Sequence, residues 1–183
     1  MKQSTAIKIA TGVAAAAIGG IFLYSRATRP PVINRKVPEP AKPVDLERYL
    51  GKWYELARHE NRFQKGLDAV TADYSLENGK VRIVNSGSHK GERSSVEGHA
   101  IVADEATNAK LKVSFFGPLY TGDYWVLDHD DNYAWSIVGE PSGRYLWLLT
   151  RDAKPAPAVV EALLKRVEAL GYDRWALRMT QQG

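Results

Sequence analysis

The feature that most constrains the fold is a succession of short segments whose side chains alternate in character, separated by turn residues. Alternation with a period of two places successive side chains on opposite faces of a strand. The predicted strands span residues 53–59, 69–76, 80–87, 94–103, 109–116, 123–129, 132–139 and 145–151. Eight consecutive strands with few long connections favour an all-β, up-and-down antiparallel barrel that closes on itself. An immunoglobulin-like sandwich is the alternative that strand number and spacing leave open.

Local signals mark the turns and the C-terminal region. The dipeptide Asn78-Gly79 lies between two predicted strands and is typical of a primed hairpin turn. Beyond the last predicted strand, apolar residues recur at helical spacing over 155–170, and Gly171 follows as a stop signal. We expect this amphipathic α-helix to pack outside the barrel. Residues 175–179 are a candidate for a final short strand.

The N-terminus carries an apolar run. Lys2 and Lys8 precede the alanine-rich residues 9–24. As a helix this run would extend roughly 24 Å at 1.5 Å per residue, short of a hydrocarbon core of about 30 Å. A basic start and a short apolar centre are typical of a signal sequence. We predict that residues 1–28 are a signal sequence or a membrane anchor; cleavage is left open, and a buried helix of the domain is the alternative.

A proline-rich stretch follows the apolar run. Residues 29–43 hold five prolines and several charges. Because proline lacks an N–H donor and favours extended chain, this stretch is predicted to be a linker that joins no sheet. The folded domain is therefore predicted to span residues 44–183. Asp45 is a candidate N-cap for a short turn over 46–50 that leads into the closed end of the barrel.

Composition and spacing argue against several classes of function. A net charge of +4 is too small and too scattered to indicate nucleic-acid binding. The sequence has no cysteine, which removes disulfides, thiolate metal sites and a cysteine nucleophile. Its four histidines are scattered, and no nucleophile motif is present. The acidic cluster 128–131 falls at a strand-to-strand turn, which favours turn capping over a metal or acid–base site. We predict no catalytic residue, metal or cofactor.

Three short motifs carry a resemblance to a known family. Gly51-Lys-Trp53 opens the first predicted strand, His129-Asp130-Asp-Asn-Tyr133 forms a turn, and Thr150-Arg151 ends the last strand. In this order, on an eight-strand pattern, they resemble the three signatures of the lipocalins, although the second has His129 where threonine is usual. The wording of residues 53–58 and 112–118 is similar to bacterial lipocalins and their apolipoprotein D relatives. The resemblance covers about residues 44–180.

The resemblance implies both architecture and function. It implies an eight-stranded lipocalin barrel closed at one end by Trp53, with the Arg151 guanidinium lying across the indole. It implies a non-enzymatic carrier of hydrophobic lipids, fatty acids or lysophospholipids, for storage or transfer at the bacterial cell envelope, outer membrane included. A lipocalin-fold enzyme acting on a lipidic or isoprenoid substrate is the alternative, and a membrane-tethered module that binds another protein is a third hypothesis.

The same resemblance raises a question of membrane attachment. Bacterial members are typically lipoproteins held by a lipid on a cysteine after the signal sequence, and this sequence has no cysteine. We therefore expect an exported, periplasmic, membrane-associated protein that is not a cysteine-linked lipoprotein and contacts the membrane through its N-terminal segment. We expect the protein to be a monomer or a homodimer.

Strand parity, with the register fixed by Trp53 and Arg151, predicts which side chains face the ligand. Small residues such as Ala72, Gly98 and Ala100 are expected to leave volume inside the barrel, although a packed core without a cavity is the alternative. The predicted ligand-binding residues are Ala57, Phe63, Tyr74, Asn85, Val113, Phe115, Tyr124, Val126, Tyr145, Trp147 and Leu149. An apolar and aromatic lining suits an acyl chain.

Charged residues near the predicted mouth raise two further expectations. Arg58, Arg62 and Lys65 are candidates to attract a phosphate or carboxylate head group while Phe63 covers the acyl chain. Glu55 faces inward by parity, and because an unpaired buried carboxylate is costly, we expect Arg151 or a backbone group to satisfy it rather than the ligand.

Overall fold

The computed structural model describes residues 29–115 and 117–183. The prediction for residues 1–28 lies outside these described residues. Residues 31–183 form one compact unit, and the architecture below is that of this unit. Within the described residues, no helix combines the length and apolar character needed to cross a membrane.

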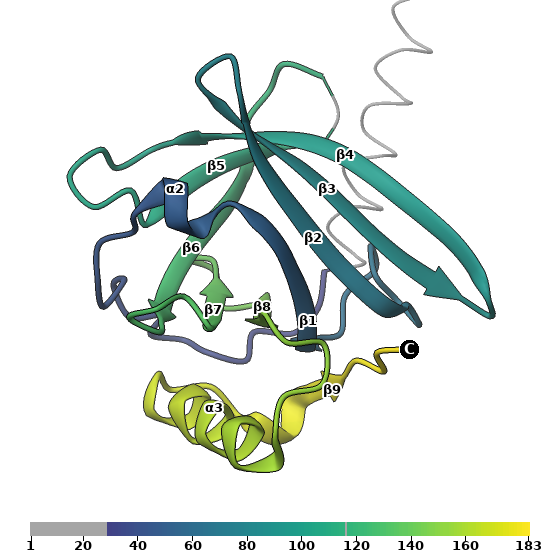
Figure 1. Ribbon diagram of the computed structural model, residues 1–183. Helices are drawn as coiled ribbons and strands as arrows, with labels where there is room; N and C mark the ends of the chain where they lie inside the picture. Colours follow the sequence, from purple (N-terminus) through teal and green to yellow (C-terminus); the bar gives the residue numbers. More distant parts are fainter. Residues whose placement is uncertain (1–28, 116) are drawn as a thin grey trace, which may run out of the picture. The chain divides into compact units, whose positions relative to one another are not determined.

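The unit is a closed antiparallel barrel of eight strands plus one short accessory strand (Figure 1). Consecutive strands pair in order from β2 to β8, and β1 closes the ring by pairing with both β8 and β2. This closure confirms the predicted barrel and excludes the sandwich. The strands are β1 (Gly51–His59), β2 (Asp68–Glu77), β3 (Lys80–His89), β4 (Glu92–Val102), β5 (Lys110–Ser114), β6 (Gly122–His129), β7 (Trp135–Gly139) and β8 (Leu146–Thr150).

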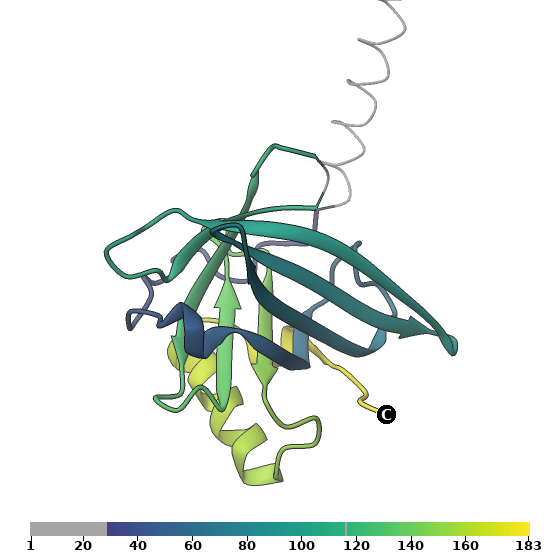
Figure 2. The ribbon, with the colours of Figure 1, turned by 45° about the horizontal axis from the view of Figure 1, so that its top comes forward.

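Helices and a ninth strand complete the unit. Helix α3 (Pro157–Ala169) confirms the predicted amphipathic helix and lies outside the barrel (Figures 1 and 2). Its buried Leu163 and Val167 pack into a cluster with outward-facing residues of β6, β7 and β8. The short 3-10 helix η1 (Arg174–Ala176) leads into β9 (Leu177–Met179), which pairs antiparallel with β1.

Two turns form as the sequence predicts. Asn78 and Gly79 have φ values of 50° and 75°, the positive angles that a primed hairpin turn requires, and they join β2 to β3. At the entry to the barrel, Asp45 caps α2 (Leu46–Tyr49) by accepting a hydrogen bond from the Arg48 N–H. The cap fixes α2 across one end of the barrel, immediately before β1.

Arg151 and Trp53 close that end. The Trp53 side chain is fully buried, and the Arg151 guanidinium lies 3.8 Å from the centre of its ring. The same guanidinium donates hydrogen bonds to four backbone carbonyls in residues 48–52, at 2.8–3.2 Å. The indole N–H in turn donates to the Tyr49 carbonyl at 2.9 Å. One cation thus satisfies the carbonyls that α2 and the start of β1 leave unpaired.

The turn that resembles the second lipocalin signature lies at the same end. Asp130 accepts hydrogen bonds from the N–H groups of Asn132 and Ala134, which is the turn capping that the sequence predicts. Tyr133 has a φ of 57°, and its hydroxyl accepts a hydrogen bond from the Asp45 N–H at 2.7 Å. The β6–β7 turn is therefore tied to the cap of α2.

A β-bulge in β1 changes which side chains face inward. Glu55 pairs with Leu149, but Ala57 pairs with Leu148, so that Leu56 is an extra residue. An extra residue in one strand reverses the parity of everything that follows. Ala57 consequently packs in the outer cluster under α3 and Arg58 turns inward. The prediction that Ala57 faces the interior is wrong for this reason.

The C-terminal residues fill a gap between β1 and β2. Strands β1 and β2 pair only over residues 51–54 and 71–74. Beyond that point, the Thr180 N–H bonds the Leu56 carbonyl, and the Ala69 N–H bonds the Gln181 carbonyl. The Gln182 amide donates to the carbonyls of Glu55 and Val70 at 2.8 and 2.9 Å. The C-terminal residues therefore complete the barrel wall where β1 and β2 do not pair with each other.

The proline-rich stretch is more than a spacer. Residues 31–43 form no strand, yet Ile33 and Val37 pack against the outer cluster. The N–H groups of Ile33 and Asn34 both donate to the Gly143 carbonyl, and a side chain at Gly143 would meet the Asn34 carbonyl oxygen. From Pro31 onward the stretch follows the outside of the barrel instead of crossing solvent.

A tyrosine cluster fills the closed half of the barrel. The hydroxyls of Tyr49, Tyr74 and Tyr124 form a chain with 3.0 Å between neighbouring oxygens, and Tyr49 also bonds the Ser136 hydroxyl at 2.9 Å. Burial raises the pKa of Tyr49 to about 12 and raises the pKa values of Tyr74 and Tyr124 well above their usual range. These phenols stay neutral over the physiological range.

We predict that Arg151→Lys lowers the free energy of unfolding by roughly 2–4 kcal/mol, because an ammonium has fewer donors and cannot lie flat on the indole. Urea unfolding followed by tryptophan fluorescence measures the loss. Arg82→Lys is the matched control, since Arg82 forms an exposed pair with Glu97, and should change stability little. Equal losses in the two variants would contradict the closing role of Arg151.

We predict that the barrel loses stability as pH rises from about 10 through about 12. Tyrosines ionise near pH 10 in the unfolded chain, whereas Tyr49 resists ionisation until about pH 12. Its raised pKa therefore stabilises the fold fully below pH 10, by on the order of 2 kcal/mol, and the stabilisation disappears as Tyr49 ionises. The measurement is tyrosinate absorbance against pH in the wild type and in Tyr49→Phe. If Tyr49→Phe lost as much stability as the wild type between about pH 10 and pH 12, the prediction would be contradicted.

Candidate ligand-binding cavity

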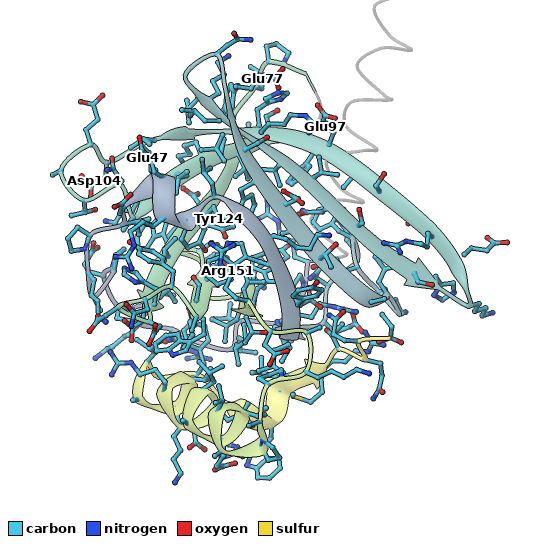
Figure 3. All side chains as sticks on the ribbon, in the orientation of Figure 1. Glu47, Glu77, Glu97, Asp104, Tyr124 and Arg151 are labelled. Carbon is cyan, nitrogen blue, oxygen red and sulfur yellow. The ribbon has the colours of Figure 1, made fainter. Side chains whose placement is uncertain are left out.

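The barrel interior holds a cavity of about 110 Å³ beside the tyrosine cluster. Its wall comes from β1, β2, β3, β5, β6 and β8 and from the loops that follow β1 and β5, so no single segment of the sequence builds it. Residues predicted to contact ligand that line this cavity are Tyr74, Asn85, Val113, Phe115, Tyr124, Trp147 and Leu149. Tyr124 is labelled inside the ring of strands in Figure 3, whereas charged groups such as Glu77 and Glu97 lie on the outside.

A second, smaller void of about 20 Å³ lies toward the closed end. Val126, another predicted ligand-binding residue, lines this void and not the main cavity. Tyr74, Ile83 and Tyr124 line both spaces. The hydrogen-bonded tyrosines therefore stand between the two, and they set the depth of the main cavity.

Part of the volume expected from small residues is occupied. Gly98 was predicted to leave space, but a Cβ there would lie 2.6 Å from both the Phe115 ring and the Ser114 carbonyl oxygen. The missing side chain is needed for this close approach of β5 to β4. Ala72, by contrast, does line the cavity.

A buried polar network forms one side of the cavity. The Glu55 carboxylate, 2% exposed, accepts from Arg58 at 2.6 Å, from Gln64 at 2.8 Å and from the Thr180 hydroxyl. Gln64 in turn accepts from the Trp147 indole N–H at 2.7 Å. Glu55 is satisfied internally, as predicted, although its partner is Arg58 and not Arg151.

Arg58 is buried inside the barrel and is not exposed at its open end. Its side chain is fully buried. Besides Glu55, the guanidinium donates to Glu60 and to the carbonyls of Gln64 and Leu67. These bonds use its donors, so the prediction that Arg58 attracts a head group is wrong; the bulge that turns it inward is the cause.

Two other predicted ligand contacts lie off the cavity wall. Phe63 is 62% exposed in the loop after β1, with the Arg62 guanidinium 4.6 Å from its ring centre. Tyr145 stacks on Trp147, with 5.8 Å between ring centres and 9° between planes, and thereby supports a residue of the wall. Lys65 is exposed in the same loop as Phe63.

Groups that could suggest chemistry have structural partners. Among residues 29–115 and 117–183, no cluster of three or more His, Cys, Asp or Glu side chains could hold a metal ion. The His59 ring bonds the Arg144 carbonyl, and the His129 ring lies between the carbonyls of Pro43 and Asp130. Asp128 pairs with Arg166 of α3 at 2.5 Å.

Sequence reasoning missed four lining residues, Gln64, Val70, Thr71 and Asp123. Val70 has the parity of Ala72 and Tyr74, so extending the inward set of β2 by two residues would have found it. Gln64 belongs to an irregular loop, where no periodicity applies, and only the folded loop brings it over the cavity.

Comparison with known proteins identifies the fold and its relatives. Residues 44–182 match the model of a lipocalin-like domain. The outer membrane lipoprotein Blc of Vibrio cholerae is 40% identical over 153 residues, covering 80% of this chain and 89% of that protein. Temperature-induced lipocalin-1 of Arabidopsis thaliana is 38% identical, covering 81% and 85%, and apolipoprotein D of Cavia porcellus is 36% identical, covering 96% and 93%.

Solved structures agree with the architecture. Insecticyanin from the tobacco hornworm Manduca sexta superposes with a TM-score of 0.64 at 21% identity, covering 80% of this chain and 86% of that one. The cockroach allergen Per a 4 gives the same TM-score at 17% identity, covering 82% and 96%. At these identities the likeness concerns the fold alone. The family model and the curated relatives go further: this chain belongs to the lipocalin family.

Proposed function

We propose that the protein binds and carries hydrophobic lipids, fatty acids or lysophospholipids, in its barrel cavity. The observation that carries the proposal is the composition of the cavity wall, which includes Val113, Phe115, Trp147 and Leu149. Apolar walls with few polar groups are the usual composition of small-molecule sites. Membership of the lipocalin family supports the same reading.

The energetics of an acyl chain fit such a wall. Burial of each methylene contributes about 0.8 kcal/mol, so ten methylenes contribute about 8 kcal/mol. This offsets an association cost of about 4 kcal/mol or more. The cavity of about 110 Å³ is smaller than the ~300–1,000 Å³ of typical ligand sites. A long chain therefore requires side chains to move, and displacement of Tyr124, which borders both spaces together with Tyr74 and Ile83, would help to join them.

We further propose that the protein acts at a bacterial cell envelope, for storage or transfer of these lipids. The relatives named outer membrane lipoprotein Blc support this location. Because the printed sequence has no cysteine, we propose that the apolar segment within residues 1–28 provides the membrane association.

We predict that Ala72→Phe lowers the affinity for a fatty acid at least tenfold, because a ring at this position occupies the cavity. Titration with a fluorescent fatty acid, followed through quenching of tryptophan emission, measures the affinity, since Trp147 lines the cavity. Ser75→Phe is the matched control, on the exposed face of the same strand. Equal affinities in the wild type and Ala72→Phe, or no saturable quenching in the wild type, would contradict the proposal.

We predict that Tyr124→Ala shifts the preferred ligand toward longer acyl chains, because it joins the main cavity to the smaller void. The same change should lower stability by roughly 3–5 kcal/mol, the usual result of removing a buried ring. Affinities for a series of chain lengths measure the shift. Tyr124→Phe is the control and should keep the wild-type preference.

A further inference from the structure

We propose that the cavity selects lipids whose polar group is uncharged, such as an ester, an alcohol or an amide, and that Asn85 hydrogen-bonds this group. The inference rests on the proposed lipid-binding function and ranks ligands within it: a fatty acid binds in the cavity, but more weakly than the neutral ester or alcohol of the same chain length. It follows from the charges and hydrogen-bond partners that the interior presents.

The wall offers no cation to a buried anion. Of the described residues that line the cavity, none is lysine, arginine or histidine. Lys112, which is not a lining residue, is the partner of Asp123 at 2.6 Å, so that its charge is already paired with a carboxylate of the cavity wall. A carboxylate drawn inside the barrel would lose its hydration without gaining an opposite charge, which is strongly unfavourable.

The two charged residues that line the cavity, Glu55 and Asp123, are both acidic. Glu55 lines the cavity, whereas its partner Arg58 lies behind it and is directed at the loop after β1. The ion pair is neutral as a whole, but a ligand meets its carboxylate side. A ligand carboxylate placed nearby would face this carboxylate and not the guanidinium, which is unfavourable.

Most polar side chains of the wall are already occupied. The Trp147 N–H bonds Gln64, and Gln64 bonds Glu55. The hydroxyls of Tyr74 and Tyr124 bond each other. A ligand could use these groups only by breaking an existing bond.

Asn85 is different. It lies in β3 between Ala72 of β2 and Val96 of β4, on the same face as the buried Ile83. Within the described part of the chain, its side-chain amide has no hydrogen-bond partner, although it lines the cavity. An amide presents both a donor and an acceptor without charge. It can donate to an ester carbonyl, or exchange a hydrogen bond with a hydroxyl, at no cost in ion desolvation.

The test compares three ligands that share one acyl length and differ at the polar end: decanoate, methyl decanoate and decanol. Each competes at neutral pH with a fluorescent lipid bound to the full chain. We expect methyl decanoate and decanol to bind about tenfold more tightly than decanoate. We expect Asn85→Ala to weaken the two neutral ligands by about three- to tenfold, the loss of roughly one hydrogen bond, and to leave decanoate nearly unchanged.

Ser86→Ala is the matched control, because it changes the next residue of the same strand, on the opposite face. Its affinities for all three ligands should equal those of the wild type. Decanoate binding as tightly as the neutral ligands would overturn the selectivity while leaving lipid carriage intact. An unchanged ratio in a folded Asn85→Ala would overturn the role of Asn85. Failure of all three ligands and of the fluorescent lipid to bind would instead contradict the proposed function itself.

Discussion

The structure depends on the contact between the Arg151 guanidinium and the Trp53 indole. A barrel of this size needs one end closed so that its interior stays dry, yet closure by a helix leaves backbone carbonyls without partners. Arg151 solves both problems, because its planar group covers the ring while its N–H donors reach the carbonyls of residues 48–52. A lysine has neither the shape nor the number of donors.

One half of the barrel interior is packed with side chains that stabilise the fold, and the other half holds the cavity. The closed half is filled by tyrosines whose hydroxyls bond one another, so that buried polar atoms remain satisfied. The other half holds the cavity and the Glu55–Arg58 network. A buried ion pair is weak evidence for stability. Here it fixes the loop after β1, since Arg58 bonds the carbonyls of Gln64 and Leu67, and through Gln64 it also orients Trp147.

Alternation predicted the strands well because one face of each is buried and a slip of one residue would expose it. The same rule failed where the backbone breaks it. The bulge at Leu56 reverses the parity of Ala57 and Arg58, and no residue type in Gly51–Arg58 signals an extra residue there. Gln64 could not be found from periodicity because it belongs to a loop. The contact of Trp53 with Arg151 was accessible only through the resemblance to lipocalins, since nearly a hundred residues separate them.

The C-terminal tail has a practical consequence for work on this protein. Thr180 and Gln182 are bonded to Glu55 and Val70, two residues whose side chains line the cavity. An affinity tag or fluorescent protein fused directly after Gly183 would strain these hydrogen bonds. Because they hold residues of the cavity wall, the measured ligand affinity would change. Reporters are better inserted at the hairpin tip Asn78-Gly79, where neither a cavity residue nor a buried ion pair is disturbed.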